Sequence, residues 1–201
     1  MIAAVAYALA YVATLFPPIV AFLRYDPKDV VILLGGFLYG PLSAVAVSAV
    51  VSLLEMVTIS PEGPIGTLMN IVSTTSFVCV ASIVYQRRKT LDGAVIGLVL
   101  GVLFMTGIMT LWNYLIVPIY QGVPRHVVVG MLLPVFIPFN LIKGSINAVL
   151  TMLLFKPIVV ALHKSGLIEP AIIGNRSSKI KWIFIAATLV VVTAILLLVN
   201  M

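Results

Sequence analysis

Long apolar runs separated by short turns constrain this chain more than any other feature of its sequence. Two examples are Leu91 to Tyr120 and Pro41 to Val57. The second of these runs carries a single charge, Glu55. Of all residues, 62% are hydrophobic and only 9% are charged, a balance far from that of soluble proteins. A bilayer core offers no water to backbone polar groups, so runs of about 20 apolar residues cross it as helices. The sequence therefore predicts an all-α integral membrane protein surrounded by membrane lipid.

Prolines and polar turns divide residues 1–165 into six expected helices, which would form one membrane-embedded, substrate-binding bundle. The second is the shortest, because only about 12 residues follow Pro27 before the break at Gly40 and Pro41, too few to cross the hydrocarbon. We expect it to be short, tilted or partly re-entrant. The others are Ile2 to Phe16, Pro41 to Val57, Ile65 to Tyr85, Leu91 to Tyr120, and His126 to Leu162 with breaks at Pro134 and Pro138.

A basic linker and a further apolar run follow this bundle. Residues 166–181 form the expected linker on the cytoplasmic side. Trp182 to Val199, within residues 182–201, is long and apolar enough to predict an additional transmembrane helix.

The basic residues indicate orientation in a membrane rather than a nucleic-acid partner. The formal charge is +6, but most basic residues form two clusters beside apolar runs, as the positive-inside rule describes. If both clusters face the cytoplasm and the short second segment crosses, the N-terminus is cytoplasmic and loops 17–29, 59–64 and 121–125 are outside. If the second segment does not cross, the N-terminus is outside. The clusters are Arg87 to Lys89, and His163, Lys164, Arg176, Lys179 and Lys181.

A polar stripe interrupts the sixth expected helix. Asn140, Lys143 and Asn147 are spaced i, i+3 and i+7, so a helix places them on one face over about two turns. A lysine and two amides within a bilayer are costly unless they face a cavity, a partner or water. The stripe therefore predicts a binding cavity inside the bundle.

Other residues are expected to share this cavity, which we predict to face outward. Asparagine amides offer a donor beside an acceptor, and lysine adds a donor, which suits the edge of a flat heterocycle such as a pyrimidine ring. Aromatic side chains nearby could cover the faces of that ring. Asn113 and Asn147 could instead bond between helices, with the aromatic residues as interface anchors. The candidate binding residues are Tyr25, Asp26, Trp112, Asn113, Tyr114, Phe139, Asn140, Lys143 and Asn147.

Three acidic residues have simpler interpretations. Asp26 before Pro27 is typical of a helix N-cap, and Asp29 then falls in the first turn, where a carboxylate favours the positive helix end. Capping alone is the simplest interpretation of both aspartates. Glu55 lies near the end of its helix, so we expect it at the membrane interface rather than buried.

Small residues predict two close helix contacts. Ala4 with Ala8 and Ala6 with Ala10 form small-xxx-small pairs in the first helix, which allow another helix to approach, either inside this protein or in a partner. Gly93, Gly97 and Gly101 repeat at steps of four in the fifth helix and predict a packing groove.

The sequence lacks the motifs of an autonomous pump or an enzyme. It contains no GxxxxGK[ST] loop, no GxGxxG and no His/Cys cluster, and its single cysteine, Cys79, receives no role. We therefore predict no catalytic residues, no metal site and no catalytic cofactor. An obvious internal repeat of the transporter type is also missing. A binding protein that draws energy from a partner fits these observations best.

Several motifs in order resemble one membrane-protein family. They are Leu23-Arg-Tyr-Asp-Pro-Lys-Asp29, Gly35-Gly-Phe-Leu-Tyr-Gly-Pro41, Gly63-Pro-Ile-Gly with Asn70, Asn113-Tyr-Leu-Ile-Val-Pro118, and Pro138-Phe-Asn-Leu-Ile-Lys-Gly144. Together they resemble the riboflavin-specific S component of energy-coupling factor (ECF) transporters, the RibU family. The resemblance covers about residues 1–165, and the run 182–199 exceeds the six helices of that family.

The resemblance implies a function and a set of partners. It implies a six-helix protein that binds riboflavin, with FMN left open, in an outward pocket under the loop joining helices one and two. Asn113, Asn140 and Lys143 match the positions of the family's polar ring contacts, and the alanine face matches its docking surface for a transmembrane T component carried by two ABC-type ATPases. It also implies uptake by reorientation in the bilayer. An S component for thiamine or a folate, or a membrane-embedded enzyme or structural subunit, are the alternatives.

Overall fold

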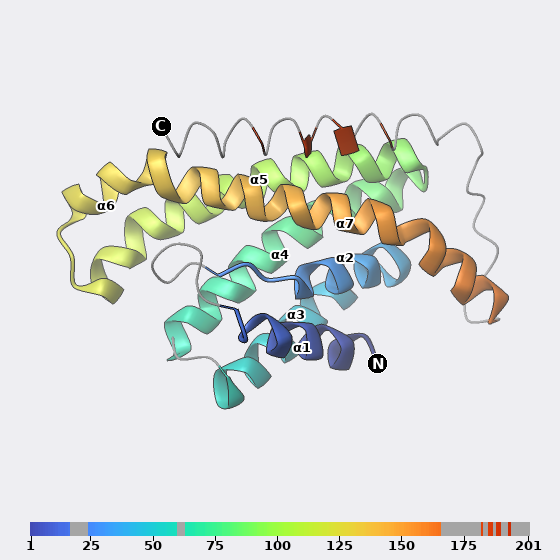
Figure 1. Cartoon of the computed structure of the whole chain (residues 1–201), viewed down its shortest axis with the longest axis horizontal. Helices are drawn as coiled ribbons and strands as arrows, with labels where there is room; N and C mark the ends of the chain where they lie inside the picture. Colours follow the sequence, from blue (N-terminus) through green and yellow to red (C-terminus); the bar gives the residue numbers. More distant parts are fainter. Residues whose placement is uncertain are drawn as a thin grey trace.

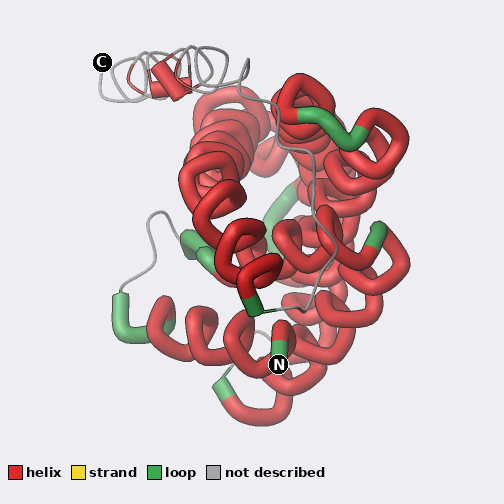
Figure 2. The backbone as a smooth tube through the Cα atoms, turned by 90° about the vertical axis from the view of Figure 1, so that its right-hand side faces the viewer, coloured by secondary structure: helices red, strands yellow, loops and turns green. Residues whose placement is uncertain are grey.

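The protein is helical throughout the part that the structure describes. The computed structural model describes residues 1–16, 24–59 and 63–165, with isolated positions between 182 and 193. Every regular element in these residues is a helix (Figure 2), which confirms the predicted all-α class. The predicted linker 166–181 and most of the predicted last helix 182–199 lie outside the described residues.

The helices follow the apolar runs closely. Four stretches are long and apolar enough to cross a membrane, namely α3, α4, α5 and the continuous rod 125–161 that includes α6 and most of α7, whereas α1 is apolar but shorter. The elements are α1 (Ile2–Ala13), α2 (Lys28–Tyr39), α3 (Pro41–Thr58), α4 (Gly63–Arg88), α5 (Leu91–Gln121), α6 (Arg125–Met131), the π-helical segment η1 (Leu132–Phe136) and α7 (Ile137–Lys164).

The sixth predicted helix changes its helical geometry at the predicted breaks without ending there, so that α6, η1 and α7 follow one another directly. The π-helical segment η1 contains Pro134 and joins α6 to α7, and Pro138 lies in the first turn of α7. One carbonyl near the irregularity is occupied by a side chain, because the Asn140 amide donates to the Phe136 carbonyl oxygen at 2.8 Å. Such π-helical turns are often found at functional sites.

The short helix α2 is the centre of the bundle. It contacts α1, α3, α4 and α7, and Figure 1 shows it lying among them. Its 12 residues are mostly buried, and the buried residues include both of its charges, Lys28 and Asp29. At about 1.5 Å per residue the helix is about 18 Å long, shorter than the roughly 30 Å of the hydrocarbon, and neighbouring helices surround it. The charges of α2 must therefore find partners on the surrounding helices.

Glycines let α4 and α5 pack backbone to backbone, as the predicted groove requires. A Cβ atom on Gly97 would lie 2.6 Å from the Ala81 carbonyl oxygen, and one on Gly101 would lie 2.8 Å from the Phe77 carbonyl oxygen. Gly107, on the same helix, has nothing within 4 Å of its Cβ position. Close approach is thus required at the first two positions and not at the third.

We expect Gly97→Ala to destabilise the protein and Gly107→Ala to leave it as stable or slightly more stable. Forcing α4 and α5 apart at Gly97 should cost about 1–3 kcal/mol, whereas alanine is favoured over glycine in an open helix position by up to about 1 kcal/mol. Thermal unfolding of both variants in the same detergent measures the difference. Equal stability of the two variants would contradict the close packing.

Candidate ligand-binding site

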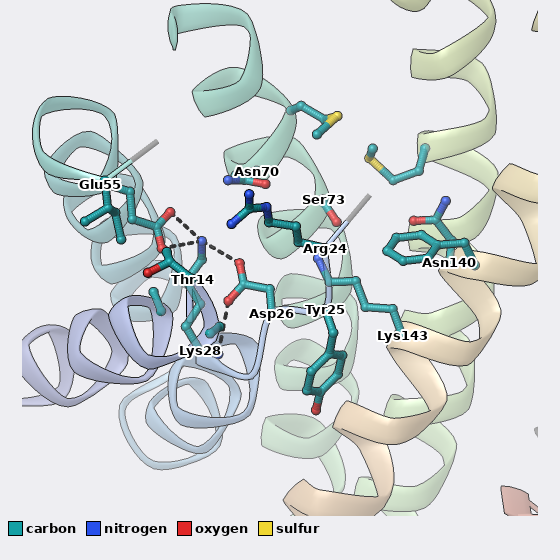
Figure 3. Close-up of a pocket in the computed structure, with 16 residues that line it drawn as sticks. Thr14, Arg24, Tyr25, Asp26, Lys28, Glu55, Asn70, Ser73, Asn140 and Lys143 are labelled. Atoms are coloured by element: carbon teal, nitrogen blue, oxygen red, sulfur yellow. Dashed lines mark hydrogen bonds and ion pairs between the residues drawn. The ribbon is translucent and has the colours of Figure 1, made fainter. Parts of the chain in front are cut away.

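A pocket lies among α1, α3, α4, α5, α7 and the segment that leads into α2. Figure 3 shows Glu55, Lys28 and Asp26 on one side of it and Asn140 and Lys143, both on α7, on the other. Five of the predicted binding residues line it, namely Tyr25, Asp26, Phe139, Asn140 and Lys143. Further lining residues are Ala10, Ala13, Thr14, Arg24, Lys28, Glu55, Ile59, Met69, Asn70, Ser73 and Met109.

Lys28 is clamped between two carboxylates at one side of the pocket. Its Nζ atom lies 2.6 Å from Asp26 Oδ2, and 2.7 and 2.6 Å from the two carboxylate oxygens of Glu55. Glu55 is 5% exposed, so the prediction that it is not buried was wrong. The reason is that the buried helix α2 carries a cation to it, which position within α3 alone does not reveal.

Asp26 lies one residue before Pro27, which is the N-cap residue of α2 in place of the predicted Asp26. Its Oδ1 atom still accepts from the Lys28 backbone N–H at 3.2 Å, while Oδ2 pairs with the Lys28 ammonium. Burial alone would raise the pKa of the Asp26 carboxyl, but Lys28 and Lys143 outweigh burial and hold this pKa below its usual value. The carboxylate therefore stays charged beside the pocket.

Asp29 does more than favour the helix end, so capping alone does not explain it. Its carboxylate is fully buried and faces groups from two other helices. Thr74 on α4 donates to Oδ1 at 2.6 Å, and Oδ2 accepts from the Asn147 amide at 3.3 Å and lies 3.5 Å from the Lys143 ammonium. The polar residues of α4 gave a weak signal for this contact, since Asn70, Ser73 and Thr74 share one helix face.

Asn147 bonds between helices, which is the alternative that the sequence left open. It is fully buried and outside the set of pocket-lining residues. The Tyr25 hydroxyl donates to its Oδ1 at 2.8 Å, and its Nδ2 donates to the Asp26 carbonyl oxygen at 3.2 Å. Burial, followed by the nearby Asp29 and Asp26, raises the pKa of the Tyr25 phenol, so its proton stays in place for this bond. Asn147 thus fastens the segment before α2 to α7.

Asn113 is a buried amide without a protein partner. Its side chain has no exposed surface, and neither its nitrogen nor its oxygen has a hydrogen-bond partner among the residues that the structure describes. Met109 and Val117 lie one turn to either side on the same face of α5. Met109 lines the pocket, and Val117 packs in a small apolar cluster with Phe136 and Phe139. Asn113 is not among the residues that line the pocket, but it lies on the face of α5 that continues from Met109 toward η1 and α7.

The two aromatic neighbours of Asn113 do not line the pocket. Trp112 packs against the main hydrophobic core, and the Arg125 guanidinium lies 5.3 Å above the centre of the Tyr114 ring. Neither side chain is placed to cover a ring in this pocket.

The alanines of α1 divide between its inner and outer faces. Ala6 and Ala10 are buried inside this protein, and Ala10 also lines the pocket. Ala4 and Ala8 are exposed. Only the outer pair leaves room for another protein to approach.

Together these features define a multi-pass membrane protein with a pocket between its helices that charged and amide side chains help to line. The chain belongs to the family of ECF transporter substrate-specific components, whose family model matches residues 1–155.

Relatives with similar sequences carry consistent names. The chain is 30% identical to the riboflavin transporter FmnP of Bacillus subtilis over 77% of this chain and 86% of that protein. It is 28% identical to the riboflavin transporter RibU of Staphylococcus aureus over 78% of this chain and 85% of that protein. The riboflavin transporter RibU of Streptococcus thermophilus is also 28% identical, with 82% of each chain covered.

A solved structure shares the fold. It is described as the structure and mechanism of the S component of a bacterial ECF transporter. The similarity has a TM-score of 0.69 at 29% identity and covers 81% of this chain and 93% of that one.

We expect Lys28→Met to destabilise the protein strongly, by about 3–5 kcal/mol, because it leaves the buried Glu55 and the partly buried Asp26 close together without their cation. Combining it with Glu55→Gln removes one of the two negative charges, so the double variant should recover part of this loss. Unfolding in detergent, monitored by circular dichroism, measures both effects. Lys156→Met, at an exposed position of α7, is the control and should change little. A double variant no more stable than Lys28→Met would contradict the charge argument.

Proposed function

We propose that this protein binds riboflavin and takes it up across the cytoplasmic membrane as the S component of an ECF transporter. The names of the relatives from three organisms support riboflavin as the substrate. The family supports a role as the binding subunit of a larger transporter rather than as an enzyme. ATP hydrolysis would take place in partner subunits, which we propose to be two ABC-type ATPases and a transmembrane T component.

The buried Asn113 amide is the observation that carries this proposal. A buried amide without partners costs about 1–3 kcal/mol, and such groups in folded proteins are nearly always satisfied. The edge of a pyrimidine ring, with alternating carbonyl and N–H groups, would supply both missing bonds. A planar ligand that enters past Met109 would meet Asn113 on the same face of α5.

Two residues of α7 would complete the recognition of the ring. Asn140 uses its Nδ2 for the Phe136 carbonyl, so its side-chain oxygen is left to accept from the ligand. Lys143 lines the pocket and would donate to a ring carbonyl or nitrogen. Phe139, next to Asn140 in sequence and also on the pocket wall, would pack against the ring face.

The outer face of α1 is the surface that we propose for the T component. Ala4 and Ala8 are small and exposed, so a partner helix can approach α1 closely there. Uptake would then proceed by reorientation of the loaded S component, with its N-terminus on the cytoplasmic side.

We expect the purified protein to quench riboflavin fluorescence on titration and the pocket variants Lys143→Met and Asn140→Ala to bind more weakly. Losing one charged or neutral hydrogen bond to the ring should cost about 1–3 kcal/mol each, or roughly 5- to 150-fold in Kd. Lys156→Met removes an exposed lysine from the same helix and should bind normally. Unchanged affinity in both pocket variants would contradict this site.

A ligand panel separates the alternatives within the same titration. Thiamine and a folate should not compete with riboflavin, and tighter binding of either would replace the proposed substrate. Comparison with FMN shows whether the pocket also accepts a phosphate. Conversion of riboflavin into a product would instead indicate a membrane-embedded enzyme.

We expect Ala4→Leu and Ala8→Leu to prevent assembly with the T component and ATPases while riboflavin binding persists. A leucine at a close helix contact should cost about 1–3 kcal/mol, or roughly 5- to 150-fold in association. Co-purification of the co-expressed subunits measures this loss. Val99→Leu, at an exposed position of α5, is the control and should assemble normally. Full assembly of both alanine variants would place the docking surface elsewhere.

A further inference from the structure

We propose that Asp29 is a positioning residue for ligand binding, because it holds the Lys143 ammonium in place for the ligand. This inference rests on the proposed function, which gives Lys143 its contact with the ring. Neither the position of Asp29 in the first turn of α2 nor the capping interpretation suggests this role.

Asp29 is itself fixed by groups from two neighbouring helices. The Thr74 hydroxyl on α4 donates to Oδ1 at 2.6 Å, and the Asn147 amide on α7 donates to Oδ2 at 3.3 Å. The carboxylate has no exposed surface. A buried carboxylate with a donor on each oxygen has little freedom to move, so it provides a fixed negative charge beside the pocket.

Lys143 pairs with Asp29 but keeps hydrogen-bond donors that Asp29 does not occupy. The two groups are 3.5 Å apart, which is longer than the roughly 2.7–2.9 Å typical of a strong charge-assisted hydrogen bond. Among the described residues, Asp29 is the only ion-pair partner of Lys143, and no hydrogen bond to another side chain accompanies it. An ammonium has three donors, so donors are left for a ligand in the pocket that Lys143 lines.

Lys28, the other buried lysine, differs from Lys143 in how many of its hydrogen-bond donors are occupied. Lys28 has three carboxylate oxygens within 2.7 Å, from Asp26 and Glu55, and so has no donor to spare. Lys143 would become similarly occupied only by moving, and its four-carbon side chain is flexible enough to do so. A fixed carboxylate at moderate distance directs Lys143 while leaving its donors available.

The consequence is that the effect of Asp29 on affinity should pass through Lys143. Residues that orient ligand-contacting groups are worth about 10–100-fold in affinity at metal sites, and we expect Asp29→Asn to weaken riboflavin binding by a similar factor. In a Lys143→Met background the same substitution should change the affinity by less than about threefold. Two residues that act through one contact are non-additive, whereas a purely structural effect of Asp29 would add to that of Lys143.

A double-mutant cycle on the full chain tests this. Riboflavin affinity is measured by fluorescence quenching for the wild type, Asp29→Asn, Lys143→Met and the double variant. Glu55→Gln is the matched control, since it removes a charge from the other buried cluster, and its effect should add to that of Lys143→Met. Additive losses for Asp29→Asn would overturn the proposal.

A second measurement needs no ligand and adds a milder variant, Thr74→Val, in case Asp29→Asn does not fold. Labelling of ligand-free protein with an amine-reactive reagent, followed by mass spectrometry, reports how freely Lys143 moves. Labelling at Lys143 should rise in Asp29→Asn and, less strongly, in Thr74→Val, which loosens Asp29 but keeps both charges, and not in Glu55→Gln. Unchanged labelling in both would overturn the positioning role. Absence of riboflavin binding by the wild type would overturn the proposed function instead, so the two failures are distinguishable.

Discussion

Buried charges must be compensated within the protein, and the centre of this structure depends on that requirement. The segment leading into α2 and the first turn of this helix bring Asp26, Lys28 and Asp29 into the interior. Removing an ion from water is costly unless it is paired and hydrogen-bonded. Three other helices supply the pairing, through Glu55 on α3, Thr74 on α4 and Lys143 on α7. Each of these contacts also fixes α2, a helix too short to be held by the bilayer itself.

The charges separate into two groups with different properties. The cluster of Lys28, Asp26 and Glu55 is closed, because the lysine ammonium has carboxylate oxygens on both sides at 2.6 to 2.7 Å. The pair of Asp29 and Lys143 is longer and lies beside the pocket. The closed cluster fixes the backbone that enters α2. The pair of Asp29 and Lys143 leaves hydrogen-bond donors of Lys143 available for the proposed ligand. This difference explains how a pocket with so many charges can still be stable before it is filled.

Features that depend on one segment could be predicted from the sequence, whereas contacts between distant segments could not. Helix bounds followed from apolar runs and prolines, and the stripe of Asn140, Lys143 and Asn147 followed from helical spacing, which needs no other segment. The partners of Glu55 and Asp29 could not be predicted in this way, because Lys28 and Thr74 reach them only through the packing of α2 against α3 and α4. Asn147 was predicted to bind a ligand, with bonding between helices as the alternative, but its actual bonds to Tyr25 and Asp29 depend on the path of the segment before α2.

Helix α1 connects the pocket with the proposed docking surface. Its inner face contributes Ala10 to the pocket, while Ala4 and Ala8 lie on its outer face. With 12 residues it is about 18 Å long, too short to be held in the bilayer by its length. The Tyr7 hydroxyl donates a 2.9 Å hydrogen bond to Thr58 Oγ1, which ties α1 to the end of α3.

Because α1 contributes Ala10 and Ala13 to the pocket and carries Ala4 and Ala8 on its outer face, a ligand that displaces this helix would also displace the surface proposed for a partner. In the proposed transporter, movement of α1 would therefore give occupancy of the pocket a direct physical route to the partner subunits.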